Sequence, residues 1–230
     1  LFLQRLATST AFLPAAVATL AELRPALAAT TGIESRWGLV RQQFPFAEAK
    51  VPLNAANLCP SPRAVTEQVV AFTHDIDNDC SFNNRNKFKK LLEESRSKAA
   101  AGIGADPDEV ALVRNTSEAN NTINNGMQLG KGDEVVIWEQ NHPTNNVAWD
   151  VRAARRGFSV KRITLPKQPK NEQELVDAFE AALTSRTRVL SITHVSNLSG
   201  IRLPAKAIGA VAKKCGIYFH VDGAQSWGAV

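Results

Sequence analysis

From Pro107 onward the chain alternates short apolar runs with amphipathic segments, and this alternation limits the possible folds more than any other feature. Apolar runs separated by helices indicate right-handed βαβ units and a buried, mostly parallel sheet. We expect strands over Asp108–Asn115, Glu134–Trp138, Phe158–Leu165, Thr187–Thr193 and Ile217–Val221. We expect helices over Ser117–Gln128, Asn145–Arg156, Asn171–Leu183 and Pro204–Cys215. The sequence therefore predicts an α/β fold.

The region before Pro107 has a less regular pattern. An arm through residues 44–62 precedes a helix expected from about Arg63 to His74, and a long charged helix is expected from about Asn84 to Gly102. Together these patterns predict three parts: residues 1–28, an N-terminal arm with helices over 29–106, and a ligand-binding α/β region over 107–230.

Residues 1–28 have the composition of an export signal. An apolar core at Ala11–Leu20 is followed by an Ala-Leu-Ala triplet at residues 26–28, of the small-x-small kind that signal peptidases cut. The segment is too short and too interrupted to span a membrane comfortably. The chain starts with Leu, and LFLQ is what would follow the arginine pair of a twin-arginine signal. The segment predicts export to the periplasm. Its alternative is an amphipathic N-terminal helix or arm of a cytoplasmic protein.

Charge and cysteine content argue against two classes of site. Lys and Arg outnumber Asp and Glu by 27 to 22, but they are spread along the chain and not gathered into a basic stripe, which argues against nucleic-acid binding. Cys59, Cys80 and Cys215 lie far apart, with no CxxC pair and no Cys/His cluster. We expect three free thiols, no disulfide framework and no metal site.

Ligands of a parallel sheet bind outside the carboxyl ends of its strands, so the loops after the strands are the candidate site. In the loop Arg114–Asn121, Thr116 and Ser117 precede a helix, where free N–H groups and a partial positive charge suit a phosphate. The alternative is an ordinary helix cap. No GxGxxG or P-loop glycine pattern is present, which disfavours a nucleotide site.

Two further loops carry one candidate each. His142 follows a strand, ahead of Pro143, and its ring could stack on an aromatic ligand or move a proton; Thr144 is the expected cap of the next helix. The alternative is a surface histidine. Asn197 offers a donor and an acceptor, although it could equally serve a turn.

The last loop follows the strand that ends at Val221. Asp222 stands at the mouth of the sheet, Gly223 and Ala224 are small enough for a planar ring to approach, and Gln225 can reach a ring substituent. A carboxylate at that depth is costly without a cationic partner. No neighbour in sequence supplies one, so we expect a ligand cation.

The four motifs NTSEANN, NHPTN, HVSNLSG and HVDGAQS, in this order, resemble the pyridoxal-phosphate enzymes of the class V aminotransferase family, which includes cysteine desulfurases and isopenicillin N epimerase. NAANLCPSPRAV and NNRNKF are also similar, so the likeness covers about Trp37–Val230. It implies the large domain of a fold type I pyridoxal-phosphate enzyme.

The resemblance also implies roles for the candidate residues. Ser117 and the backbone of residues 116–118 would hold the cofactor phosphate, and His142 would stack on the pyridine ring. Asp222 would pair with the ring nitrogen. In the same loop, the small Ala224 would let the ring approach, and Gln225 would bind the ring hydroxyl. Asn197 would contact that hydroxyl or the substrate carboxylate.

Such enzymes act on an amino acid, are usually homodimers, and need a lysine that forms a Schiff base with the cofactor. In the family that lysine lies a few dozen residues after the Asp222 strand, and the chain ends before it. We therefore expect an N-terminal fragment, inactive alone, that stops before the small C-terminal domain. Lys206, Lys213 and Lys214 have the spacing of a solvated helix face and are not assigned this role.

The resemblance leaves the reaction open among aminotransferase, epimerase and lyase chemistry. Desulfuration ranks lower, because the three cysteines are poor candidates for a mobile catalytic thiol. A different class also stays open, namely a non-catalytic α/β binding protein that keeps a pyridoxal-phosphate-like pocket.

Overall fold

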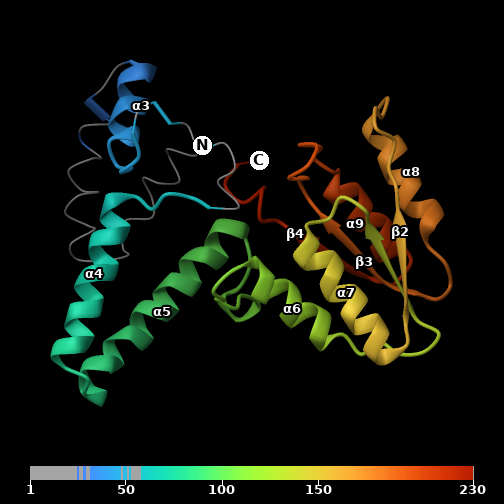
Figure 1. Cartoon of the computed structure of the whole chain (residues 1–230), viewed down its shortest axis with the longest axis horizontal. Coiled ribbons are helices and arrows are strands. Elements are labelled where there is room, and N and C mark those ends of the chain that lie inside the picture. The colour runs from blue at the N-terminus through green and yellow to red at the C-terminus, as the bar shows by residue number, and fades with distance from the viewer. Residues whose placement is uncertain are drawn as a thin grey trace. The chain divides into compact units, whose positions relative to one another are not determined.

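A computed structural model of the chain describes residues 25, 28–29, 32–47, 49–50, 52 and 58–229 (Figure 1). It divides into two compact units, one ending at Leu112 and one beginning at Val113. We call them the helical unit and the sheet unit. The sequence-based division lies at residue 107. The predicted export segment falls outside the described residues except at positions 25 and 28.

The helical unit contains α3 (Ile33–Arg41), α4 (Arg63–Asn78) and α5 (Phe82–Ile103), followed by a single 3₁₀ turn, η1 (Pro107–Glu109). α4 and α5 were expected, and both extend beyond the predicted bounds. α3 was not expected from the sequence. Within the described part of the chain, no helix is long and apolar enough to cross a bilayer.

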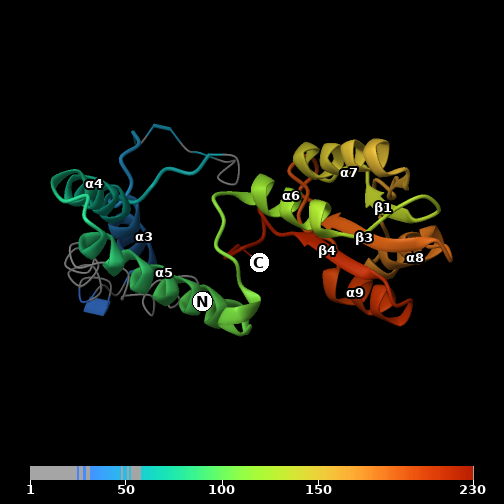
Figure 2. The same ribbon diagram turned by 90° about the horizontal axis from the view of Figure 1, so that it is seen from below.

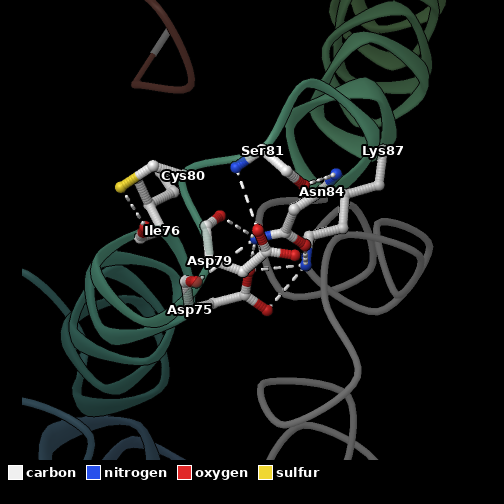
Figure 3. Close-up of polar contacts among 7 residues, drawn as sticks. All are labelled: Asp75, Ile76, Asp79, Cys80, Ser81, Asn84 and Lys87. Carbon is white, nitrogen blue, oxygen red and sulfur yellow. Dashed lines mark hydrogen bonds and ion pairs between the residues drawn. The ribbon is translucent and has the colours of Figure 1, made fainter.

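A polar network closes the turn between α4 and α5 (Figure 3). The Ser81 hydroxyl caps α5 by accepting from the Asn84 backbone N–H at 3.1 Å. The Asn84 side-chain amide donates to Asp75 Oδ1 at 2.6 Å and to the Asp79 carbonyl at 2.8 Å. Lys87 Nζ lies 2.6 Å from the same Asp75 oxygen and lowers the pKa of that carboxyl, with Asn84 as the next cause. Part of the NNRNKF motif therefore serves to join two helices.

The sheet unit is built on four parallel strands in the order β2-β1-β3-β4. The strands are β1 (Glu134–Trp138), β2 (Ser159–Ile163), β3 (Thr187–Thr193) and β4 (Tyr218–Asp222). The helices are α6 (Thr116–Gly126), α7 (Pro143–Arg156), α8 (Glu172–Ala182) and α9 (Ala205–Lys214). This arrangement confirms the predicted α/β fold with a parallel sheet.

The strand predicted over Asp108–Asn115 is wrong. Residues 107–109 form η1, and residues 110–115 pair with no strand in the described part of the chain. The local contacts favour the turn: the Asp106 N–H donates to Glu109 Oε2 at 3.0 Å, and the Pro107 carbonyl accepts from Arg96 at 2.6 Å. A strand is stable only when its backbone groups find a neighbouring edge, and apolar character alone does not supply one.

Apolar side chains fill both faces of the sheet, because successive residues of a strand point to opposite faces. In Figure 2, α7 lies on one face and α9 on the other. Val136, Trp138, Leu190 and Ile192 pack on the face that α8 and α9 cover. Val135, Ile137 and Val189 pack with Trp149 of α7 and with Phe158 on the opposite face.

Phe179 of α8 is fully buried in the first of these clusters. Phe179→Ala should lower the free energy of unfolding by about 3–5 kcal/mol, because it removes apolar contacts and leaves a cavity. Urea unfolding measures this loss. The control Lys206→Ala, at an exposed position of α9, should change it by less than about 0.5 kcal/mol. Equal losses in the two variants would contradict this packing.

Candidate functional site

The carboxyl ends of β1, β3 and β4 meet at one edge of the sheet. Thr193 ends β3 and pairs in register with Asp222 at the end of β4. The backbone N–H of His142, in the loop after β1, donates to Thr193 Oγ1 at 3.1 Å. The two residues that the sequence singled out as catalytic, His142 and Asp222, are thus both neighbours of Thr193.

Asp222 is a buried carboxylate, with 3% of its surface exposed. Its Oδ2 accepts from the Asn120 side-chain amide at 3.0 Å, and its Oδ1 accepts from the Ala224 backbone N–H at 3.1 Å. Both donors are neutral. Asp222 takes part in none of the ion pairs found between described residues. A buried anion held only by neutral donors suits a cationic group of a ligand.

Asn141 fixes the loop that carries His142. Its side chain is buried, and the amide donates to the Ser191 carbonyl at 2.9 Å while Oδ1 accepts from the Thr193 N–H at 2.6 Å. The side chain thereby occupies two backbone groups of β3. These two hydrogen bonds hold the loop after β1 against the carboxyl end of β3.

His142, and not Thr144, caps α7. Its Nδ1 lies 3.3 Å from the Thr144 backbone N–H, which donates to it, and 2.8 Å from Thr144 Oγ1. Pro143 at the first helical position has no N–H, so the next N–H is the first that a cap can accept from. The imidazole is thereby attached through one nitrogen to the start of a helix.

The start of α6 differs in one detail from the prediction. Asn115 is the cap, since its Oδ1 accepts from the Glu118 N–H at 2.9 Å, and Thr116 and Ser117 are the first two helical residues. Their N–H groups lie where helix termini offer free donors. Arg114 forms an ion pair with Glu118 and lowers the pKa of that carboxyl. Ser117 lies one turn before Asn120, the residue that contacts Asp222.

The remaining predicted site residues lie in turns. Ala224 and Gln225 are in the turn directly after β4, with Gln225 half-buried. Asn197 is exposed in the turn after β3. Among the described residues, the side-chain hydrogen bonds of that turn come from its serines: Ser196 and Ser199 both donate to Gln140 Oε1, at 3.0 and 2.7 Å. In the part of the chain that the structure describes, no hydrogen bond joins Asn197 to Asp222, whose carboxylate accepts from Asn120 and Ala224.

A second polar group lies two strand positions before the site, on the same face of the sheet, and was missed from the sequence. Asn145 of α7 donates to Ser191 Oγ at 3.2 Å, and Ser191 Oγ lies 2.9 Å from His220 Nδ1. The His220 ring meets Trp149 edge to face, with centroids 6.4 Å apart. Burial lowers the pKa of His220, and the nearby Asp222 opposes this effect. The available signal was a polar residue on each of two apolar strands, with His220 and Asp222 two positions apart and hence on one face.

The lowered pKa of His220 predicts a pH dependence of folding. The unfolded chain binds the proton more readily than the folded one, so the free energy of unfolding should decrease as the pH falls below about 6.5. His220→Gln should reduce this slope in urea unfolding between pH 5 and 7. His194, whose pKa is lowered by burial and Arg202, retains part of the slope. The control His74→Gln, at an exposed position of α4, should keep the wild-type slope; an unchanged slope in His220→Gln would contradict the prediction.

Comparisons with solved structures find the same fold in known proteins. Solved structures include a cysteine desulfurase from Escherichia coli, with a TM-score of 0.70 and 27% identity over 82% of this chain and 48% of that one. A second, titled as a C-DES mutant with glycine covalently linked to the PLP cofactor, has a TM-score of 0.74 at 22% identity, which shows the shared fold alone, and covers 83% of this chain and 51% of that one.

Curated relatives match at the sequence level. A probable cysteine desulfurase of Methanothermobacter thermautotrophicus is 33% identical over 82% of this chain and 47% of its own length. An isopenicillin N epimerase of Amycolatopsis lactamdurans is 31% identical over 85% of this chain and 50% of its own. The chain spans about half the length of these relatives. Residues 54–230 match the aminotransferase class-V family, and the chain belongs to that family.

Proposed function

We propose that the full-length protein is a pyridoxal-phosphate-dependent enzyme that acts on an amino acid. The observation that carries this proposal is Asp222, a buried carboxylate at the carboxyl edge of the sheet with two neutral donors and no ion pair among the described residues. Membership of the aminotransferase class-V family and the similarity to a probable cysteine desulfurase and an isopenicillin N epimerase support the same proposal.

The residues present fit the cofactor. Ser117 and the first N–H groups of α6 would hold its phosphate, because a helix N-terminus favours an anion. The His142 ring would lie against the pyridine, Asp222 would face the ring nitrogen, and Gln225 would bind the ring hydroxyl. Asn197, in the turn after β3, would contact that hydroxyl or the substrate carboxylate.

When bound, pyridoxal phosphate supplies a sink for the electrons released as a bond to the substrate Cα breaks. Asp222 contributes a fixed negative charge that favours a proton on the ring nitrogen. His142 would orient the pyridine ring, because its own imidazole is held through Nδ1 by the hydroxyl and the N–H of Thr144. Its Nε2 is the nitrogen left to exchange a proton with a ligand.

The proposal extends to the type of reaction that the enzyme catalyses. One relative is described as a probable cysteine desulfurase and another as an isopenicillin N epimerase. Pyridoxal phosphate stabilises a carbanion, which loss of a proton from the substrate Cα would produce. We therefore propose Cα–H activation as the common first event, within aminotransferase, epimerase or lyase chemistry. Assembly as a homodimer and export through a twin-arginine signal are further proposals that rest on the sequence alone.

Replacing the Asp222 carboxylate tests the proposed role directly. In the full-length protein, Asp222→Asn should slow the exchange of α-hydrogens in D₂O by roughly 100-fold or more, because a neighbouring charge shifts a pKa by about 1–3 units and each unit is tenfold. Proton NMR of a panel of L-amino acids with added pyridoxal phosphate measures the exchange.

The matched control is Asp177→Asn, at an exposed position of α8, which should exchange at the wild-type rate. Near-normal exchange in Asp222→Asn would refute the assignment. Cofactor binding without exchange by the wild-type protein would instead favour a non-catalytic binding protein.

Ser117→Ala tests the phosphate site. Loss of one hydrogen bond worth about 1 kcal/mol should raise the dissociation constant for pyridoxal phosphate by about fivefold in a fluorescence titration of the full-length protein. Ser185→Ala, in the exposed turn before β3 and hence at the opposite end of the sheet, is the control and should bind normally. If both variants bind equally, the phosphate lies elsewhere.

A further inference from the structure

Helix α6 carries four asparagines, and their burial divides them into two pairs. Asn120 and Asn124, one turn apart on one face, are each only 2% exposed. Asn121 and Asn125 are exposed. Asparagine is a poor helix former, and a buried amide is costly unless it is hydrogen-bonded. The buried pair therefore needs an explanation other than helix formation.

Asn120 has a defined partner far away in the sequence. Its side-chain amide donates to Asp222 Oδ2 at 3.0 Å, while the other oxygen of Asp222 accepts from the Ala224 N–H. Each carboxylate oxygen thus has one donor, and the two donors come from different elements, α6 and the turn after β4. Two such anchors restrict rotation of the carboxylate about its Cβ–Cγ bond.

The chemical nature of this donor matters as much as its position. A lysine or arginine at the position of Asn120 would also hold the carboxylate, but its own charge would satisfy the anion. A neutral amide stabilises the ionised form through a hydrogen bond and adds no positive charge. The negative charge of Asp222 stays available for a cation that arrives with a ligand.

We propose that Asn120 is a positioning residue for Asp222: it holds the carboxylate in the orientation, and with the full charge, that a cationic ring nitrogen requires. This inference rests on the proposed function. It adds a residue of α6, the helix whose first turn carries Ser117, so that one helix would set both the phosphate site and the carboxylate that faces the ring.

Asn124 provides a matched control within the same helix. It has the same burial as Asn120, yet neither of its side-chain polar atoms has a hydrogen-bond partner among the described residues. Asn124→Leu replaces an unpaired buried amide by an apolar group of similar size, which is neutral or stabilising. Asn120→Leu makes the same change and also removes the donor to Asp222.

The first experiment needs no cofactor. A double-mutant cycle in the cofactor-free full-length protein combines Asn120→Leu with Asp222→Ala and follows the unfolding equilibrium constant in urea. The two changes should be coupled by about tenfold, because Asp222→Ala removes the charge that makes loss of the amide costly. The cycle of Asn124→Leu with Asp222→Ala should be additive. Additivity in both cycles would overturn the inference.

The second experiment measures the positioning itself. With saturating pyridoxal phosphate, Asn120→Leu should lower the rate of α-hydrogen exchange by about tenfold, while the dissociation constant for the cofactor changes by less than about threefold. The alkaline limb of the rate–pH profile should move to lower pH, because a displaced carboxylate favours the ring proton less. Asn124→Leu should show the wild-type rate and profile.

The two proposals fail in different ways. If Asp222→Asn abolishes exchange and Asn120→Leu does not alter its rate or pH profile, the positioning role is overturned and the proposed function stands. If the wild-type protein binds no pyridoxal phosphate, the proposed function fails, and the role of Asn120 toward a ring nitrogen fails with it. A shifted profile in both Asn120→Leu and Asn124→Leu would assign the effect to packing of α6 and overturn the inference.

Discussion

Burying one negative charge at the rim of a parallel sheet is the constraint on which the site depends. Water cannot solvate the Asp222 carboxylate there, and the protein supplies two neutral donors, from Asn120 and Ala224. These two hydrogen bonds stabilise the buried carboxylate. Its negative charge is not balanced by a neighbouring cation in the described part of the chain. That imbalance connects the fold to the chemistry proposed for the family's cofactor.

The two faces of the sheet are built differently around this charge. Toward α8 and α9, the core of the sheet is apolar, with Trp138 and Ile192 among its buried residues. At the edge strand β2, Lys161 donates to the Ala182 carbonyl at the end of α8. On the α7 face they are apolar at Val189 but turn polar at Ser191 and Thr193 as β3 approaches its carboxyl end. The apolar part of that face holds the sheet and α7 together, and the polar part is where Asn141 and Asn145 attach the surrounding loops and helix.

Resemblance to a family did not by itself distinguish residues of the site from residues of the scaffold. The NNRNKF motif is part of the likeness, but Asn84 and Lys87 serve the turn between α4 and α5 through Asp75. In NTSEANN, by contrast, the first of the two adjacent asparagines reaches Asp222 and the second is exposed. The contacts of each side chain, and not the motif in which it stands, show whether an asparagine supports the scaffold or the site.

The sequence by itself determined the α/β fold and the alternation of β1 to β4 with α7, α8 and α9, because burial on both faces requires near-continuous apolar runs. It also determined which loops lie together at the carboxyl edge of the sheet, because the carboxyl ends of parallel strands lie at the same edge. The roles predicted for Ser117, His142, Asn197, Asp222 and Gln225 stay predictions.

Tertiary structure alone decided that Asp108–Asn115 forms no paired strand, that His142 and not Thr144 caps α7, and that Asn120 contacts a carboxylate 102 positions away. Strand pairing, cap choice and long-range hydrogen bonds depend on which groups meet in space, and local patterns of hydrophobicity do not contain that information.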